Sequence, residues 1–361
     1  MGYYYFPSSH TSSYPSQMQI ERTNHVDALN NRGFPNDEGW SRRMVWKYNR
    51  SSIKKPSFRI KEWDYFAIYS QDNDFYFCTT VSDLGYAGFV ALAFLDLKTG
   101  KYSQIDTIKP LTFGSIGLKE NTNEDFEIPF SSKDISINYS KIQEQYFIDV
   151  DAPNMILPSG EKGLNAHIRI NRDESKDSMN ILTSWKEDRK AFYLNEKFNN
   201  LPTAGLLKLG KNTFDLPSKS THSVLDWGRG VWTYQNRWFW GSASGTLNGL
   251  PFGFNIGYGF SDRSPASENA VFYNGTLHKL DDVVFHIDTY LKPWRFSSNN
   301  GRFELMFEPI LDRESHTNLI LMKSDQHQVF GRFSGDIILD NGSVLQLKNF
   351  TGFAEDVFNR W

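Results

Sequence analysis

Residues 226–245 bring together side chains that could hold an apolar ligand and pass it a proton. The segment reads DWGRGVWTYQNRWFWGSASG and contains four of the ten tryptophans in the chain. Burial among indole rings would favour the neutral, proton-donating form of Asp226, whereas a nearby arginine would favour its charged form. The π faces of the rings could stabilise developing positive charge. The candidate ligand-binding residues of this segment are Trp227, Arg229, Trp232, Tyr234, Arg237 and Trp240.

The same segment also has a purely structural interpretation. Arg229 and Arg237 could form a buried ion pair with Asp226 that fixes the entry of a strand, instead of holding the polar head of a ligand. Both interpretations stay open at the level of sequence.

Polar residues further along the chain form a second candidate set. Glu268 and Asn269 follow the loop SDRSPAS and precede an expected strand, near a barrel rim. Glu268 is a second candidate proton donor, and Asn269 could anchor a polar group of the ligand; loop capping is the alternative for both. His278 in VFYNGTLHKL could contact the ligand or simply be a hydrogen-bonded strand histidine.

An acidic and aromatic cluster lies nearer the N-terminus, in the stretch KEWDYF. Strand alternation sends Glu62 and Asp64 to one face and Trp63 and Tyr65 to the other. Two carboxylates on one face are usually solvated, so we expect that face to be exposed.

Several classes of function are excluded by what the sequence lacks. It has no P-loop and no GxGxxG that opens a helix, and GSASG has alanine where a nucleophilic serine would stand. The eight histidines include no HxH or HExxH pair, so we expect neither a metal site nor a cofactor. A net charge of −3 gives no basic surface for nucleic acid or anionic membranes.

The elements that must position these residues are predicted to be strands. Short segments with turn residues at intervals of roughly 8–12 indicate an all-β antiparallel architecture. We expect residues 1–16 to be a mobile tail, 17–200 and 201–361 to be two β domains, and the terminal AEDVFNRW to form a short helix. Aromatics make up 16% of the chain, so rings rather than aliphatic side chains should build the core. The glycines of PFGFNIGYGFSD favour barrel curvature over close approach by another group.

Several motifs together resemble the bacterial domain of unknown function 2804 family. They are the tryptophan-rich segment, SENAVFYNGTLHKL, QVFGRFSG and the closing TGFAEDVFNRW, with FRIKEWDYFAIY and VSDLGYAG in the first half. The resemblance covers nearly the whole chain after about residue 17. More distantly, that family is similar to calycin-like proteins such as carotenoid hydratases and tocopherol cyclase. This implies two lipocalin-like barrels or strongly curved sheets side by side, with a ligand pocket in or between them.

The resulting hypothesis is a protein without a cofactor that binds a largely apolar small molecule, such as an isoprenoid, lipid or acyl chain. Asp226 or Glu268 would protonate it, leading to hydration, isomerisation or cyclisation. One alternative is a carrier with the same pocket and no turnover. Another is a carbohydrate-binding or glycoside-hydrolysing protein, because tryptophan platforms and paired carboxylates also suit sugars. The sequence contains no run of about 18 apolar residues that would predict a membrane span, and its first residues do not resemble a signal peptide. We therefore expect a cytoplasmic protein.

Overall fold

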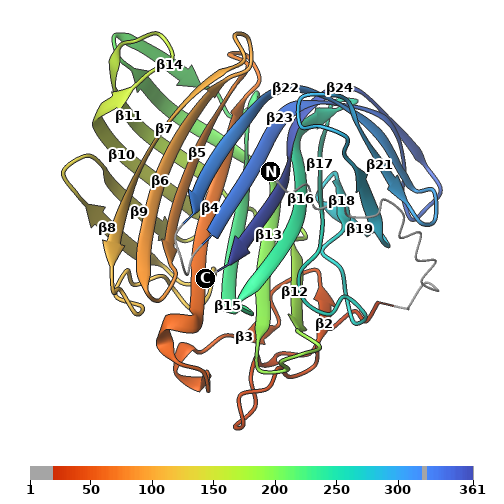
Figure 1. Ribbon diagram of the computed structural model, residues 1–361. Helices are drawn as coiled ribbons and strands as arrows, with labels where there is room; N and C mark the ends of the chain where they lie inside the picture. The colour runs from red at the N-terminus through yellow and green to blue at the C-terminus, as the bar shows by residue number, and fades with distance from the viewer. Residues whose placement is uncertain (1–18, 319–322, 361) are drawn as a thin grey trace, which may run out of the picture.

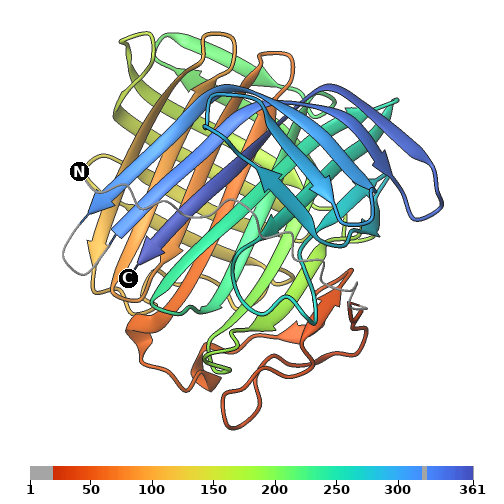
Figure 2. The same cartoon turned by 45° about the vertical axis from the view of Figure 1, so that its right-hand side comes forward.

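The computed structural model describes residues 19–318 and 323–360, so the expected mobile tail lies outside the described residues. The chain forms two large, strongly curved antiparallel sheets that lie side by side, each curled into a half-barrel (Figures 1 and 2). Across these residues the only helical segments are two single 3₁₀ turns, η1 (Arg50–Ser52) and η2 (Ser57–Arg59). None is long and apolar enough to cross a membrane. The predicted all-β class is confirmed.

The first sheet has thirteen strands and runs in the order β7-β6-β5-β4-β15-β13-β11-β10-β9-β8, with β2, β12 and β14 attached to its side. Separate from it, β1 (Val26–Asp27) and β3 (Trp46–Lys47) form a small parallel pair. The strands of the first sheet are β2 (Gly39–Ser41), β4 (Ile60–Ser70), β5 (Phe75–Asp83), β6 (Ala87–Asp96), β7 (Lys101–Pro110), β8 (Phe126–Ser131), β9 (Ser136–Ile142), β10 (Gln145–Ile156), β11 (Lys162–Asn171), β12 (Met179–Ser184), β13 (Phe192–Leu209), β14 (Asn212–Leu216) and β15 (Thr221–Val231).

The second sheet has nine strands in the order β19-β18-β17-β16-β24-β23-β22-β21-β20. The strands of the second sheet are β16 (Gln235–Leu247), β17 (Leu250–Tyr258), β18 (Ala270–Tyr273), β19 (Thr276–Lys279), β20 (Val283–His286), β21 (Trp294–Ser298), β22 (Phe303–Asn318), β23 (Lys323–Ile338) and β24 (Val344–Arg360). The chain passes from the first sheet to the second between Val231 and Gln235. The domain boundary expected after residue 200 falls inside β13.

The C-terminal segment is a strand, so the expected short helix is wrong. In β24, residues 344–360 pair with β16 on one side and β23 on the other. These backbone hydrogen bonds also satisfy the facing edges of β16 and β23, which a terminal helix would leave without partners.

The two sheets have different cores. The second contains many rings, among them Phe254, Phe303 and Phe333, but more aliphatic side chains, so the expected aromatic core is present only in part. The first is dominated by aliphatic side chains such as Ile68, Leu92 and Ile148, so there the prediction of an aromatic core is wrong. Both cores nevertheless bury enough apolar surface to hold each sheet curled.

A third apolar cluster joins the sheets. Alternation along β4 turns Phe66 and Ile68 into the first core, and Tyr65 and Tyr69 toward the second sheet. There the tyrosines pack with Phe353 and other residues of β22, β23 and β24, which Figures 1 and 2 show lying against β4 and β5. The outer face of one half-barrel therefore becomes a wall of the space between the sheets.

Candidate functional site

A cavity of about 780 Å³ lies between the two sheets, within the size range of small-molecule sites. Both sheets contribute to its wall. Its ring-bearing lining residues are Trp63, Tyr65, Tyr86, Phe89, Tyr193, Trp232, Trp238, Trp240 and Phe260. Polar and charged side chains form much of the remaining lining, so the cavity suits a guest with an apolar part against the rings and a polar part elsewhere.

The aromatic wall is an interlocked set of rings. Trp63 stacks on Tyr193 with ring centroids 5.6 Å apart, and both contact Trp232 edge-on. Trp63 can lie flat on β15 because position 228 is glycine: a Cβ at Gly228 would stand 2.2 Å from the indole ring. The glycine of the DWGRG motif therefore serves the cavity wall.

A buried lysine organises the polar side of the cavity. Lys197 Nζ lies 2.8 Å from Asp226 Oδ2 and 4.0 Å from the centre of the Trp240 ring. Asn195 Nδ2 donates to Asp226 Oδ1 at 2.7 Å. Both oxygens of Asp226 thus have a partner, and Lys197 is its counter-ion. The interpretation in which Asp226 pairs with Arg229 or Arg237 is therefore wrong.

Glu268 is a buried carboxyl with one oxygen that accepts no hydrogen bond from the described part of the chain. Its side chain is 1% exposed, and Oε2 has no hydrogen-bond partner among the described residues; Lys197 Nζ is 3.9 Å away. Desolvation raises the pKa of Glu268 to about 7, with the Lys197 cation lowering it and the Asp226 carboxylate raising it. At neutral pH a substantial fraction of Glu268 carries a proton.

The position of Glu268 depends on a neighbouring glycine. A Cβ at Gly257 would lie 2.0 Å from Glu268 Oε1, so only glycine lets the carboxyl rest on β17. The prediction that the glycines of PFGFNIGYGFSD serve barrel curvature is wrong at this position, where close approach of another side chain decides the residue.

Glu355 is a further acid at the cavity, and sequence reasoning missed it. Gln328 Nε2 donates to Glu355 Oε1 at 3.0 Å, and Arg313 Nη1 donates to Gln328 Oε1 at 3.0 Å. Burial raises the pKa of Glu355 to about 7. The sequence did contain a sign of it, because in a strand Glu355 shares one face with the apolar residues Phe353 and Val357. We expected that segment to be helical instead.

The structure brings together four of the predicted site residues. Asp226, Trp232, Trp240 and Glu268 line the cavity. Asp226 and Trp227 point to opposite faces of β15, because side chains alternate along a strand. Trp227 therefore packs in the first core, where Arg229 lies 4.2 Å from its ring and 2.9 Å from Asp64.

The other predicted ligand-binding residues lie outside this lining. Arg237 pairs with Asp356 at 2.6 Å, and Tyr234 is largely exposed. Asn269 accepts a hydrogen bond from Gly257 N and donates to the Asp281 carbonyl oxygen, which is a structural role. His278 lies 3.3 Å from Asp340.

The acidic face of KEWDYF is buried, so the expectation of solvated carboxylates is wrong. Glu62 is 3% exposed and forms an ion pair with Arg50 while accepting from Tyr48 at 2.8 Å. Asp64 is 4% exposed and pairs with Arg229. Alternation predicts the shared face correctly, but not that this face is the interior of the first half-barrel.

The raised pKa of Glu268 predicts a pH dependence of stability. Since its pKa is about 7 in the folded chain and near 4.5 when unfolded, the folded state binds more protons between these values. The free energy of unfolding should therefore fall as pH rises from 4.5 to above 7, by about 3 kcal/mol for this group. Denaturant unfolding at pH 5 and pH 8 should show a smaller difference for Glu268→Gln. Equal differences for variant and parent would contradict the assignment.

Fold and cavity define a class of all-β proteins in which two curved antiparallel sheets enclose a ligand-sized space. The chain belongs to the family described as domain of unknown function (DUF2804), whose sequence model matches residues 19–361. The family resemblance is thereby confirmed. No curated protein matches the sequence.

Solved structures share the architecture at very low identity. A candidate AttH protein of Nitrosomonas europaea superposes with a TM-score of 0.52 at 10% identity, over 85% of this chain and 95% of that one. CghA in complex with Sch210972 gives a TM-score of 0.51 at 8% identity, over 96% and 97%. Kievitone hydratase from Nectria haematococca gives 0.47 at 13% identity, over 96% and 98%. The first two show that the fold is shared.

Proposed function

We propose that this protein binds a largely apolar small molecule between its sheets and protonates it without a cofactor. The observation that carries the proposal is Glu268, a buried carboxyl at the cavity with one oxygen that accepts no hydrogen bond from any residue that the structure describes. A pKa near 7 suits a general acid at neutral pH. The fold shared with CghA and the AttH protein is consistent with this proposal.

The chemistry follows from the groups around Glu268. Its proton adds to one carbon of a double bond, whose π electrons form the new C–H bond and leave a cation on the neighbouring carbon. The π face of Trp232 stabilises that cation, whereas Trp240 already carries the Lys197 ammonium. Water addition, ring closure or loss of a different proton then completes hydration, cyclisation or isomerisation. Glu355, with its pKa also near 7, can accept the released proton.

Lys197 and Asp226 set the balance of charge around this acid. Asp226 disfavours a second carboxylate nearby and so favours the protonated form of Glu268, while Lys197 prevents Asp226 from being an uncompensated buried charge. We assign Asp226 a positioning and electrostatic role, because both its oxygens already have partners.

Filling the cavity tests ligand binding independently of catalysis. Ala91 lies in the lining and is 3% exposed, so Ala91→Phe should occupy space that the guest needs. Incubated with a lipid extract and re-isolated, the parent protein should retain apolar molecules detectable by mass spectrometry, and Ala91→Phe should retain at least about 10-fold less, equivalent to about 1.4 kcal/mol.

Val284→Phe is the matched control. Val284 is exposed on β20 and is not part of the cavity lining, so this substitution adds the same ring outside the cavity. It should retain as much ligand as the parent, with both variants showing parental circular dichroism. Recovery of only water-soluble molecules, or equal retention by both variants, would contradict an apolar guest in this cavity.

A further inference from the structure

The hairpin of β22 and β23 carries imidazole and carboxylate side chains on one face near its tip. Register places His316 opposite Asp325 and Glu314 opposite His327. The alternate residues Arg313 and Gln328 face the cavity, so this cluster lies on the other face of the hairpin, with His316 at the cavity rim. The cluster consists of Asp312, Glu314, His316, Asp325 and His327.

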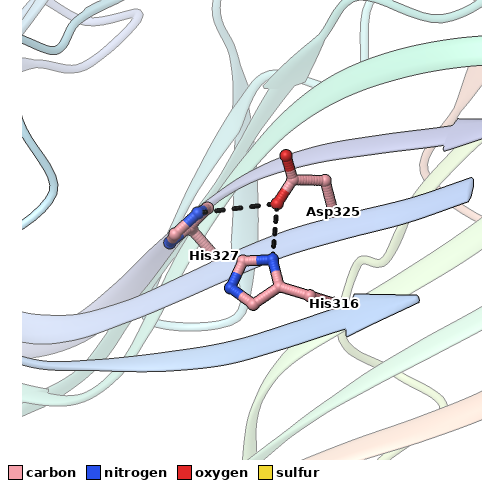
Figure 3. A group of neighbouring side chains, drawn as sticks. All are labelled: His316, Asp325 and His327. Atoms are coloured by element: carbon pink, nitrogen blue, oxygen red, sulfur yellow. Dashed lines mark hydrogen bonds and ion pairs between the residues drawn. The ribbon is translucent and has the colours of Figure 1, made fainter. Parts of the chain in front are cut away.

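Two imidazoles in this cluster converge on one carboxylate oxygen. Asp325 Oδ1 lies 2.7 Å from His316 Nδ1 and 3.8 Å from His327 Nε2, and Figure 3 shows both rings turned toward it. The three atoms all lie within 4.8 Å of one another. Two histidine nitrogens and a carboxylate oxygen are a ligand set typical of Zn²⁺.

The outer nitrogen of each ring has its own carboxylate. Asp312 Oδ2 lies 2.7 Å from His327 Nδ1, and Glu314 Oε2 lies 3.5 Å from His316 Nε2. A carboxylate that accepts the outer N–H leaves the lone pair of the ring on the inner nitrogen, which is the arrangement found around histidines that bind metals. When the proton that His316 Nδ1 shares with Asp325 Oδ1 leaves, the lone pairs of both rings are directed toward the space beside Asp325.

Burial of Asp312 supplies an independent indication. Its side chain is 4% exposed, and Oδ1 has no hydrogen-bond partner among the described residues. A buried carboxylate with a spare oxygen is costly unless a positive charge lies close by. The His327 ring that it contacts is also held by Tyr290, stacked at 3.6 Å with an interplanar angle of 14°. The site therefore combines a fixed ring with an unsatisfied negative group.

We propose that His316 Nδ1, Asp325 Oδ1 and His327 Nε2 bind a zinc ion, with Asp312 and Glu314 as positioning residues. Zinc–ligand bonds of about 2.0–2.2 Å need the ligands somewhat further apart than the present 2.7 Å contact. His316 and Asp325 can make that adjustment, since their side chains are 52% and 41% exposed. Cross-strand register assembles the set, so no linear HxH or HExxH motif reveals it.

Isothermal titration of Zn²⁺ into tag-free, chelator-treated full-length protein tests the proposal. We expect one ion per chain for the parent and loss of more than about 100-fold in affinity for His327→Ala. Asp312→Asn should weaken binding by roughly 10- to 100-fold without changing the stoichiometry, as outer-shell partners of metal ligands do.

His167→Ala is the matched control, because His167 also contacts an aspartate, Asp149 at 2.8 Å, on an exposed strand face away from the hairpin. It should bind zinc like the parent. Absence of zinc binding by the parent, or undiminished binding by His327→Ala, would overturn the proposal, provided that melting curves show all variants folded.

Discussion

Replacing Glu268 with glutamine should reduce turnover of the captured ligand at least about 100-fold while leaving ligand binding within a few-fold of the parent. Glutamine keeps the shape of the side chain on Gly257 but has no acidic proton to donate. Because the protonated form is the active one, the parent rate should fall as pH rises above about 7, the pKa of Glu268. Product formation followed by chromatography and mass spectrometry measures both effects.

A glutamate outside the cavity provides the control for this substitution. Glu308 is exposed on β22, so Glu308→Gln makes the same substitution away from the cavity and should turn over ligand like the parent. If Glu268→Gln also retained parental turnover, proton donation from Glu268 would be excluded. If the parent bound the ligand without converting it at any pH from 5 to 8, the protein would be a carrier.

Replacing Arg229 with methionine should lower the free energy of unfolding by about 3–5 kcal/mol. Arg229 is 0% exposed, and its Nη2 lies 2.9 Å from Asp64 Oδ1. Its guanidinium also donates to backbone carbonyl oxygens of Lys119 and Trp63. Removing the cation leaves the buried Asp64 carboxylate unpaired, and burial already raises the pKa of that group. Denaturant titration measures the change.

Arg237→Met is the matched control, because this arginine comes from the same tryptophan-rich segment and also pairs with an aspartate. Its side chain is 57% exposed, so the expected loss is about 1 kcal/mol or less. Equal losses for the two variants would contradict the interior position of Arg229. The double variant Asp64→Asn, Arg229→Met should recover part of the lost stability, since the unpaired charge is then removed.

The fold class could be predicted because it depends on local features. Turn residues at short intervals and the alternation in β4 indicate strands regardless of what those strands pack against. The C-terminal AEDVFNRW misled because a short apolar and acidic segment fits a helix as well as a strand. Pairing with β16 and β23, which are distant in sequence, decides the outcome.

The candidate site was predictable only in part, for a similar reason. The sequence singles out Asp226, Glu268, Trp232 and Trp240, but not the residue that each would meet. Lys197 reaches Asp226 because β13 and β15 are neighbours, with Lys197 opposite Asp226 in the register. Arg229, two residues beyond Trp227, follows the other face into the first core. Alternation along β15 thus separates residues that appear as one cluster in the sequence.

A crystal structure with the captured ligand bound tests the central claim most directly. We predict an apolar molecule enclosed by Trp63, Trp232 and Trp240, with a double-bond carbon about 3–3.5 Å from Glu268 Oε2, the separation of a reactive pair. Well-ordered ligand in any other part of the molecule, with only water beside that carboxyl, would contradict the account.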